Sequence, residues 1–420
     1  MRAELRDKKI FAWALYDWAN SAFATVVLAG FFPILFKEHW NAGVDAVTST
    51  HRLGNANSFA SLVVVFLAPV LGSIADRGGA RKRFLLFFTA MAIVMTGALW
   101  WVERGEWLMA AVLYGVAQIG FSGGLAFYDS LLVAVADRKR LDFVSAYGYS
   151  LGYLGGGLLF SANVWMVLQP ERFGFADGGE AARFAFLTVA GWWTLFAIPV
   201  FLFVPEPARA GGAGSGSAVR DGLRQLVETL RHIRSLRSVW MFLLAYWFYI
   251  DGVDTIIRMA VDYGLSIGFK STDLITALLL VQFVGFPAAL AFGWLGERIG
   301  PKRGIYLALV VYAGITLGAT MMSEVSEFYA MAMVIGLVQG GIQALSRSYY
   351  AALIPPDKAG EFFGFYNMLG KFAAVIGPAL MGLITLWFGN PRIGILSILV
   401  LFMVGAVLLH FVEEPARERA

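Results

Sequence analysis

Polar side chains interrupt the first long apolar stretch of the chain, at about residues 10–36. Asp17, Asn20 and Ser21 stand there at positions i, i+3 and i+4, so they share one face of a helix. An Asp at the centre of a membrane-spanning helix costs roughly 2.5–3.5 kcal/mol on insertion scales, a cost that Leu avoids. The spacing therefore predicts the wall of a polar cavity, suited to ion pairing, proton transfer or recognition of a polar solute.

Later apolar stretches carry polar side chains at the same spacing, and each set again shares one helical face. The sets are Gln118, Ser122 and Asp129; Asp251, Asp254, Thr255, Arg258 and Asp262; and Gln339, Gln343, Ser346, Arg347 and Tyr350, while Lys371 stands alone in a further stretch. The helices that carry these sets must surround a common space if the polar groups are to avoid lipid.

The composition requires those helices to lie in a membrane. Of 420 residues 59% are hydrophobic and 15% charged, with a mean hydropathy of +0.68, which excludes a soluble globular protein. The absence of cysteine excludes disulfides, thiolate nucleophiles and Cys-ligated metals. No Gly-x4-Gly-Lys-Ser/Thr loop and no histidine placed to activate a nucleophile occur, so we expect no enzyme, no ATP-driven pump and no cofactor.

Hydrophobic runs and their breaks predict an all-α membrane protein with twelve transmembrane helices. They lie near 10–36, 55–75, 84–102, 107–135, 143–168, 184–204, 239–262, 271–296, 304–322, 327–353, 361–388 and 391–412. Most of the 33 Lys and Arg residues fall in one set of alternate loops and in the two termini. This asymmetry predicts that both termini are cytoplasmic, and it argues against a nucleic-acid-binding surface.

Residues 205–238 form the one long polar interruption, with a Gly/Ser-rich stretch followed by an amphipathic run typical of a helix on a membrane surface. The predicted domains are therefore an N-terminal bundle of six helices at 1–204, a cytoplasmic linker at 205–238 and a C-terminal bundle of six helices at 239–420.

The two bundles share a loop motif, which indicates an internal repeat. Asp76, Arg77 and Gly79 follow the second span, and Glu297, Arg298 and Gly300 follow the eighth, each set with basic residues behind it. Similar displacements relate Gln118 to Gln339 and Leu151-Gly152 to Leu369-Gly370, so the halves form a parallel repeat about an axis along the membrane normal.

The duplicated acid-Arg-x-Gly-x-basic-basic loops in a chain of six plus six spans resemble the major facilitator superfamily. The segment Tyr16–Phe23, together with Tyr249-Ile-Asp251-Gly252 and Glu361-Phe-Phe-Gly364-Phe-Tyr366, resembles its autophagy-related vacuole-effluxer branch. The resemblance implies two pseudo-symmetric six-helix bundles that rock about a central cavity, and fungal members of the branch are associated with amino-acid efflux.

Three interpretations of the buried charges stay open. Asp17 and Asp129 lie in the first half of the chain, Arg347 and Lys371 in the second, and all fall nearer the predicted cytoplasmic side. They bind the ammonium and carboxylate of a zwitterionic substrate, or they pair as a cytoplasmic gate, or they serve static helix packing.

The mid-membrane charges have their own alternatives. Asp251, Asp254 and Arg258 line the cavity, or they form an ion pair within their helix. If protons drive transport, a desolvated carboxylate must carry them, and the candidates are Asp17, Asp129, Asp251 and Asp254.

The loop motif is predicted to act as a conformational switch. Asp76 can accept hydrogen bonds from the start of a neighbouring helix, where the helix dipole favours negative charge. The resemblance implies that this partner is the helix at 361–388, and by position Glu297 faces the helix at 143–168. The alternative is that the basic residues of the loop only set its orientation.

The function that we expect is secondary active transport of a small polar, zwitterionic solute such as an amino acid, as an exporter, with proton coupling as a further hypothesis. We expect a monomer in a bacterial inner membrane. The alternatives are an exporter of amphiphiles such as drugs or lysolipids, and a receptor or scaffold that shares the fold without transporting.

Overall fold

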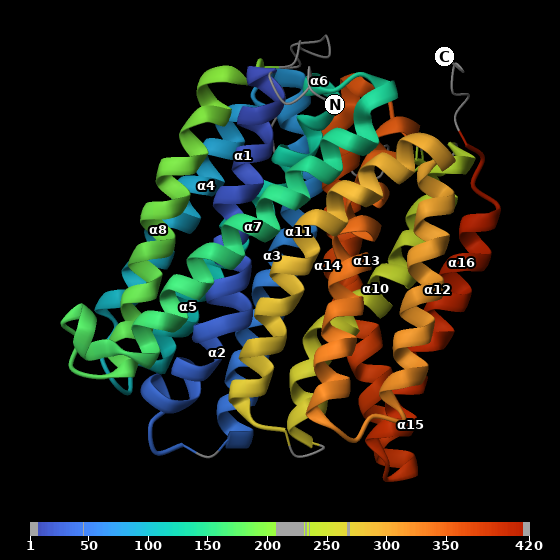
Figure 1. Cartoon of the computed structure of the whole chain (residues 1–420). Coiled ribbons are helices and arrows are strands. Elements are labelled where there is room, and N and C mark those ends of the chain that lie inside the picture. Colours follow the sequence, from blue (N-terminus) through green and yellow to red (C-terminus); the bar gives the residue numbers. More distant parts are fainter. Residues whose placement is uncertain are drawn as a thin grey trace.

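The computed structural model of the chain describes residues 7–44, 46–206, 231, 233–234, 236–266 and 269–414. Within these ranges it contains helices and no β-strand, as predicted (Figure 1). Most of the predicted amphipathic linker helix lies outside the described residues, and so do the side chains of Arg77, Arg258 and Lys371.

The part of the chain before the linker forms six helical runs. The first is continuous from α1 (Lys8–Ala22) through the π-helix η2 (Phe23–Phe31) and α2 (Phe32–Leu35) to the π-helix η3 (Phe36–Trp40). The others are α3 (Ala46–Gly78); α4 (Arg81–Ala98) with η4 (Leu99–Trp101); α5 (Trp107–Ser130) with α6 (Leu132–Val135); α7 (Leu141–Leu168), preceded by η5 (Arg138–Arg140); and α8 (Gly178–Phe203), preceded by η6 (Pro170–Phe173).

The part after the linker forms six more runs. They are α10 (Arg237–Ser266), α11 (Ser271–Ile299), α12 (Pro301–Ala319), α13 (Val325–Leu353), α14 (Ala359–Phe388) after η7 (Pro356–Lys358), and α15 (Pro391–Leu396) with α16 (Ile398–His410). All twelve runs overlap the predicted spans. Their ends differ by several residues, most of all in α3, which begins nine residues before the predicted span near 55.

Nine helices of the described residues are long and apolar enough to cross a membrane, from Lys8–Trp40 to Arg392–His410. The runs outside this set are α3, α12 and α14. Helices α3 and α14 include residues whose side chains are outside the described part of the chain. Lys302 and Arg303 open the short helix α12 and lower its hydropathy.

Helix α1 begins and α16 ends at the same end of the bundle, the upper end in Figure 1. We call this end the termini face and the other end the opposite face. Between the two halves of the chain, α7 packs along α11 and α13, and α14 packs along α3 and α5.

Glycine allows these helices to approach closely near the termini face. A Cβ atom on Gly72 of α3 would collide with the backbone of Gly360 in α14, and one on Gly293 of α11 would collide with Ala146 of α7. Gly72 and Gly293 are counterparts in the repeat, so the same device joins the halves twice.

Candidate functional site

Arg347 of α13 lies at the centre of a buried ionic cluster near the termini face. Its Nη1 and Nη2 each donate to Oδ2 of Asp17 on α1 at 3.3 Å, and Nη1 also donates to Oδ1 of Asp129 on α5 at 3.1 Å. Arg347 is 1% exposed and each acid is 5% exposed. One side chain from the second half of the chain therefore pairs with two carboxylates of the first half.

The remaining donors of the guanidinium bind α7. Arg347 Nε donates to the hydroxyl of Ser145 at 2.9 Å, and Nη2 donates to the Ser145 carbonyl at 2.8 Å. The guanidinium also lies over the ring of Tyr149 at 4.2 Å and the ring of Trp13 at 4.9 Å. A planar group with donors on several sides suits such a site better than an ammonium group would.

Each carboxylate has a second partner. Tyr128 donates to Oδ2 of Asp17 at 2.8 Å, and the amide of Asn367 on α14 donates to Oδ2 of Asp129 at 3.1 Å. We call these residues the Arg347 cluster: Asp17, Tyr128, Asp129, Ser145, Arg347 and Asn367. A buried ion pair becomes favourable only when its remaining donors and acceptors are also satisfied, and the cluster meets that condition closely.

A second contact joins the halves at the termini face itself. Asp76, at the end of α3, accepts the backbone N–H groups of Gly360 and Glu361 at 3.1 and 2.9 Å. Arg81 donates to the same carboxylate and, through Nη2, to the carbonyls of Pro356 and Asp357. The start of α14 thus meets a negative charge that its dipole favours, on the helix that the family resemblance implies.

The repeated copy of the loop motif differs. Glu297 and Arg298 are exposed, and the guanidinium of Arg298 lies 3.6 Å over the ring of Trp294. A Cβ atom on the preceding residue, Gly296, would meet Asp142 of α7, so this segment packs against the predicted helix. Gly79 and Gly300 both have positive φ, at 57° and 92°, which explains glycine at these two turns.

The mid-membrane acids Asp251 and Asp254 lie on α10, a helix that contributes no residue to the Arg347 cluster. Asp251 of α10 is 1% exposed and accepts the backbone N–H of Gly377 on α14 at 2.9 Å. Pro378 follows in the middle of that helix, so the carboxylate binds the backbone at a proline site. Asp254 is half-buried on α10, and the ion pair predicted within this helix depends on Arg258, whose side chain is outside the described residues.

Three predicted amide groups are buried or half-buried. Asn20 and Gln118 are 2% and 5% exposed, and Asn20 Nδ2 and Gln118 Oε1 have no hydrogen-bond partner among the described residues. Gln343 is half-buried on α13, one turn from Arg347. Lys371 falls on α14, with its side chain outside the described residues.

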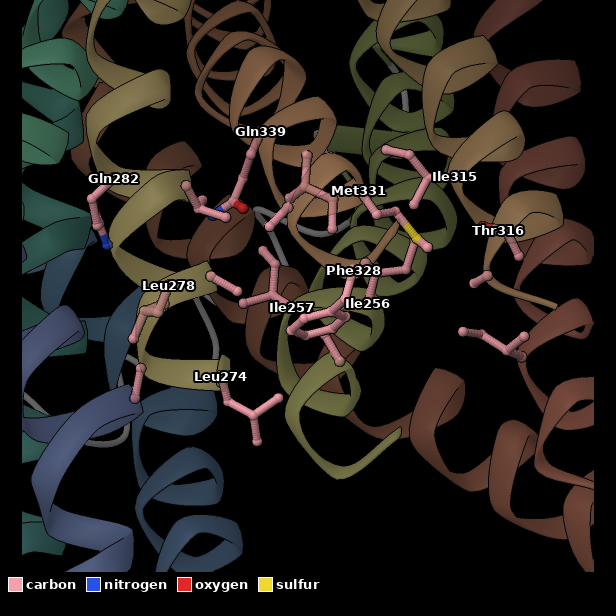
Figure 2. A pocket seen from close by; sticks show the side chains of 18 of the residues that line it. Ile256, Ile257, Leu274, Leu278, Gln282, Ile315, Thr316, Phe328, Met331 and Gln339 are labelled. Carbon is pink, nitrogen blue, oxygen red and sulfur yellow. The ribbon is translucent and has the colours of Figure 1, made fainter. Parts of the chain in front are cut away.

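A cavity of about 230 Å³ lies chiefly among helices of the second half. It lies nearer the opposite face than the Arg347 cluster does. Figure 2 shows its lining, which comes from α10, α11, α12 and α13, with α15, α16 and the η2 segment completing it. We call it the side cavity.

Sequence reasoning missed several contacts of the site. Ser145 and Asn367 bind the ionic cluster but stand outside the polar stripes that reveal the charged residues. Gln282 of α11 donates to Thr25 of η2 at 3.0 Å, joining the two halves at mid-helix. The signal for Gln282 is its isolation as a polar residue in an apolar stretch. Arg81 is one of the basic residues behind the loop motif, and its spacing does not reveal its bonds to Asp76 and to the carbonyls before α14.

Comparison with known proteins identifies the family. A family model described as "Vacuole effluxer Atg22 like" matches residues 6–140 and 135–419. The chain belongs to this family. The "Uncharacterized MFS-type transporter YxiO" of Bacillus subtilis is 39% identical over 96% of this chain and 94% of that protein. "Autophagy-related protein 22" of Coccidioides immitis is 24% identical over 98% of this chain and 88% of that protein.

Solved structures share the fold. The human organic anion transporter MFSD10 (TETRAN) has a TM-score of 0.71 at 17% identity, covering 96% of this chain and 99% of that one. The proton:xylose symporter XylE has a TM-score of 0.75 at 12% identity, covering 97% and 96%. This Atg22-like chain is thus a multi-pass membrane transporter of the major facilitator superfamily, with the predicted all-α fold, and it is not an enzyme.

Proposed function

We propose that this Atg22-like transporter moves a small zwitterionic solute, such as an amino acid, by alternating access between the halves at 1–204 and 239–420. The observation that carries the proposal is the Arg347 cluster, because a fully bonded guanidinium has no donor left for a substrate carboxylate. We therefore propose that Asp17, Asp129 and Arg347 form the gate, and that the substrate reaches them only after the cluster has parted.

The gate works by exchange of partners. With the termini face closed, Arg347 is held by α1, α5 and α7, while the Asp76 contact holds α14. Opening that face requires water or substrate to replace these bonds, since unpaired buried charges are costly. A substrate that carries both an ammonium and a carboxylate can supply complementary charge to both sides of the parted cluster.

Proton coupling follows from the same exchange. Asp17 and Asp129 lose the Arg347 cation when the gate parts, and a carboxylate that loses its cation in an apolar setting favours a proton. Asp251 is bound to the backbone of its own half, so its role here is to stabilise α14 at Pro378. We propose Asp17 and Asp129 ahead of Asp251 and Asp254 as the proton carriers.

The direction and place of transport complete the proposal. The description of the family as vacuole effluxers supports export, and the basic loops support cytoplasmic termini in a bacterial inner membrane, with the monomer as the working unit. Export of an amphiphile is the second candidate, because apolar side chains dominate the lining of the side cavity.

Reconstitution into proteoliposomes tests the proposal. We expect counterflow of at least one labelled amino acid, its loss in Arg347→Ala, and retention in Arg172→Ala, which removes an exposed arginine outside both loop motifs. Asn at Asp17 or Asp129 should abolish uphill transport driven by a pH gradient and spare exchange. Transport of lysolipids alone would favour the second candidate, and indifference of every solute to Arg347→Ala would favour a scaffold.

A further inference from the structure

The side cavity has one polar end and one apolar end. Figure 2 shows Gln282 and Gln339 on the upper side of the lining and Leu274 on the lower side. The glutamines stand near the middle of α11 and α13, whereas Leu274 and Phe328 lie close to the starts of those helices, at the opposite face. The cavity therefore extends from mid-membrane toward the opposite face, changing from amides to hydrocarbon.

The apolar part of the side cavity extends past α10 toward α12, α15 and α16, away from the plane between the two halves. Ile315 and Ala319 of α12 line it, as do Ile395 of α15 and Ile398 of α16. These helices pack within the second half, with α12 against α13 and α16 against α10. The space is therefore mainly internal to one half of the transporter, whereas the Arg347 cluster lies between the two halves.

The polar end touches the first half of the chain. Gln282 Nε2 donates to Thr25 Oγ1, and Thr25 belongs to the η2 segment, a nine-residue π-helix that also contributes Ala24 and Ala29 to the lining. π-Helical segments are rare and are frequently found at functional sites. Tyr153 of α7 packs over Gly340, the residue that follows Gln339.

The described lining residues include no ionisable side chain, and their polar groups are amides and hydroxyls. Such groups can bind an uncharged hydrogen-bonding head, while a charged head would lose its hydration without an opposite charge from these residues. A dry cavity of about 150 Å³ accepts benzene, so 230 Å³ holds a longer ligand.

We propose that the side cavity is a binding site for an uncharged amphiphile. Its alkyl or aryl portion lies among Leu274, Ile315 and Phe328, and its amide-like or hydroxyl head lies at Gln282 and Gln339. The site is independent of the Arg347 cluster, and the proposal does not require that the ligand be transported. Gln282 also donates to Thr25 of the first half. A ligand that binds Gln282 therefore affects a hydrogen bond between the two halves.

Hexanamide is the probe, compared with three molecules that have the same carbon chain and a charged head: hexanoate, hexylamine and the zwitterion norleucine. Binding is measured by saturation-transfer difference NMR on the full chain in lipid nanodiscs, with empty nanodiscs subtracted. We expect hexanamide to bind at least tenfold more tightly than each charged analogue. Tighter binding of norleucine than of hexanamide would overturn the assignment of an uncharged head. Tighter binding of hexylamine than of hexanamide would also overturn it and would indicate a cationic head near Asp254.

Cavity-filling variants place the ligand. Ala277→Leu and Ala332→Leu each extend a buried lining alanine into the cavity, and we expect each to weaken hexanamide binding at least tenfold. The matched control is Ala111→Leu, since Ala111 is the buried repeat counterpart of Ala332 in α5 and does not line the cavity. Gln339→Leu should lower the preference for hexanamide over hexanoate at least fivefold.

Unchanged hexanamide binding in both Ala277→Leu and Ala332→Leu would overturn the proposal. The melting temperature of each variant shows that it is folded, and the two alanines lie on different helices, so misfolding of one leaves the other as a test. Loss of amino-acid counterflow with retained hexanamide binding would contradict the proposed function alone, and the reverse result would contradict this site alone.

Discussion

Arg347 illustrates how a single buried side chain can set the state of a transporter. Its guanidinium satisfies Asp17, Asp129 and Ser145 simultaneously, so it is neutralised and fully hydrogen-bonded in a place that lipid and protein keep dry. The net gain from such a cluster is small compared with the cost of breaking it on one side only. That asymmetry makes the cluster sensitive to single substitutions.

Removing the cation should therefore destabilise the protein more than removing one acid. Arg347→Leu leaves two buried carboxylates without their cation, and we expect a loss of about 3–5 kcal/mol in the free energy of unfolding. Asp129→Asn leaves the Asp17–Arg347 pair in place and should cost about 1–2 kcal/mol. Reversible unfolding in mixed micelles measures both values.

The control for this comparison is Arg172→Leu, which removes an exposed arginine and should change stability by less than about 0.5 kcal/mol. A larger loss in Asp129→Asn than in Arg347→Leu would contradict the description of Arg347 as the shared partner of both acids.

At the scale of helices, the closed termini face depends on two close approaches, α3 with α14 and α11 with α7. Gly72 and Gly293 make these possible because neither has a Cβ atom. The Asp76 contact adds charge at the start of α14, where the dipole contributes about 0.3–1 kcal/mol at exposed sites and up to ~2 kcal/mol when partly buried.

Gly72→Ala should separate α3 from α14, because the added methyl group would collide with backbone that cannot rotate away. We expect a loss of about 1–3 kcal/mol, seen as a lower melting temperature of the purified protein. Gly318→Ala is the matched control, since its Cβ meets nothing within 4 Å and alanine favours the helix by roughly 0.5–1 kcal/mol. Equal melting temperatures for the two variants would show that the close approach is not required.

Helix periodicity explains which parts of the site were predictable. Asp17, Asp129 and Arg347 could be placed on inward-facing stripes because spacing along one helix is visible in sequence. Their partners Ser145 and Asn367 could not, since contacts between helices depend on crossing geometry that no single stretch encodes. The two π-helical segments and the side cavity were missed for the same reason: both depend on how neighbouring helices pack.

For the whole molecule, the repeat predicts the fold but not its asymmetry. Asp76 is buried with bonded partners, whereas its counterpart Glu297 is exposed. The polar linker predicts that the first half ends at 204 and that the second half begins at 239, and these boundaries stay a prediction. The fold itself is confirmed by the family and by the solved structures that share it.

The predicted orientation can be measured directly. Fused after Ala420, green fluorescent protein should fluoresce and alkaline phosphatase should stay inactive in a bacterial host, since the basic loops place the C-terminus in the cytoplasm. A phosphatase fusion in the loop between α7 and α8 should be active. The opposite pattern would invert the molecule and place the Arg347 cluster on the external side.

The central claim is that Arg347 closes the termini face. The chain has no cysteine, so Ser150→Cys gives a single reporter without further changes. Ser150 is fully buried on α7 between Ala146, which approaches Gly293 of α11, and Tyr153, which packs over Gly285 and Gly340. Its hydroxyl has no partner among the described residues, so cysteine removes no hydrogen bond there.

Labelling of this cysteine by a membrane-impermeant thiol reagent, applied in turn to each side of the membrane, is the decisive measurement. We predict a protected thiol in the otherwise unchanged chain and, with Arg347→Ala added, labelling at least tenfold faster from the termini face only. Arg172→Ala, which removes an exposed arginine outside the loop motifs, should leave the thiol protected. Equal labelling rates with and without Arg347, or a rate that rises equally from both sides, would contradict the gate.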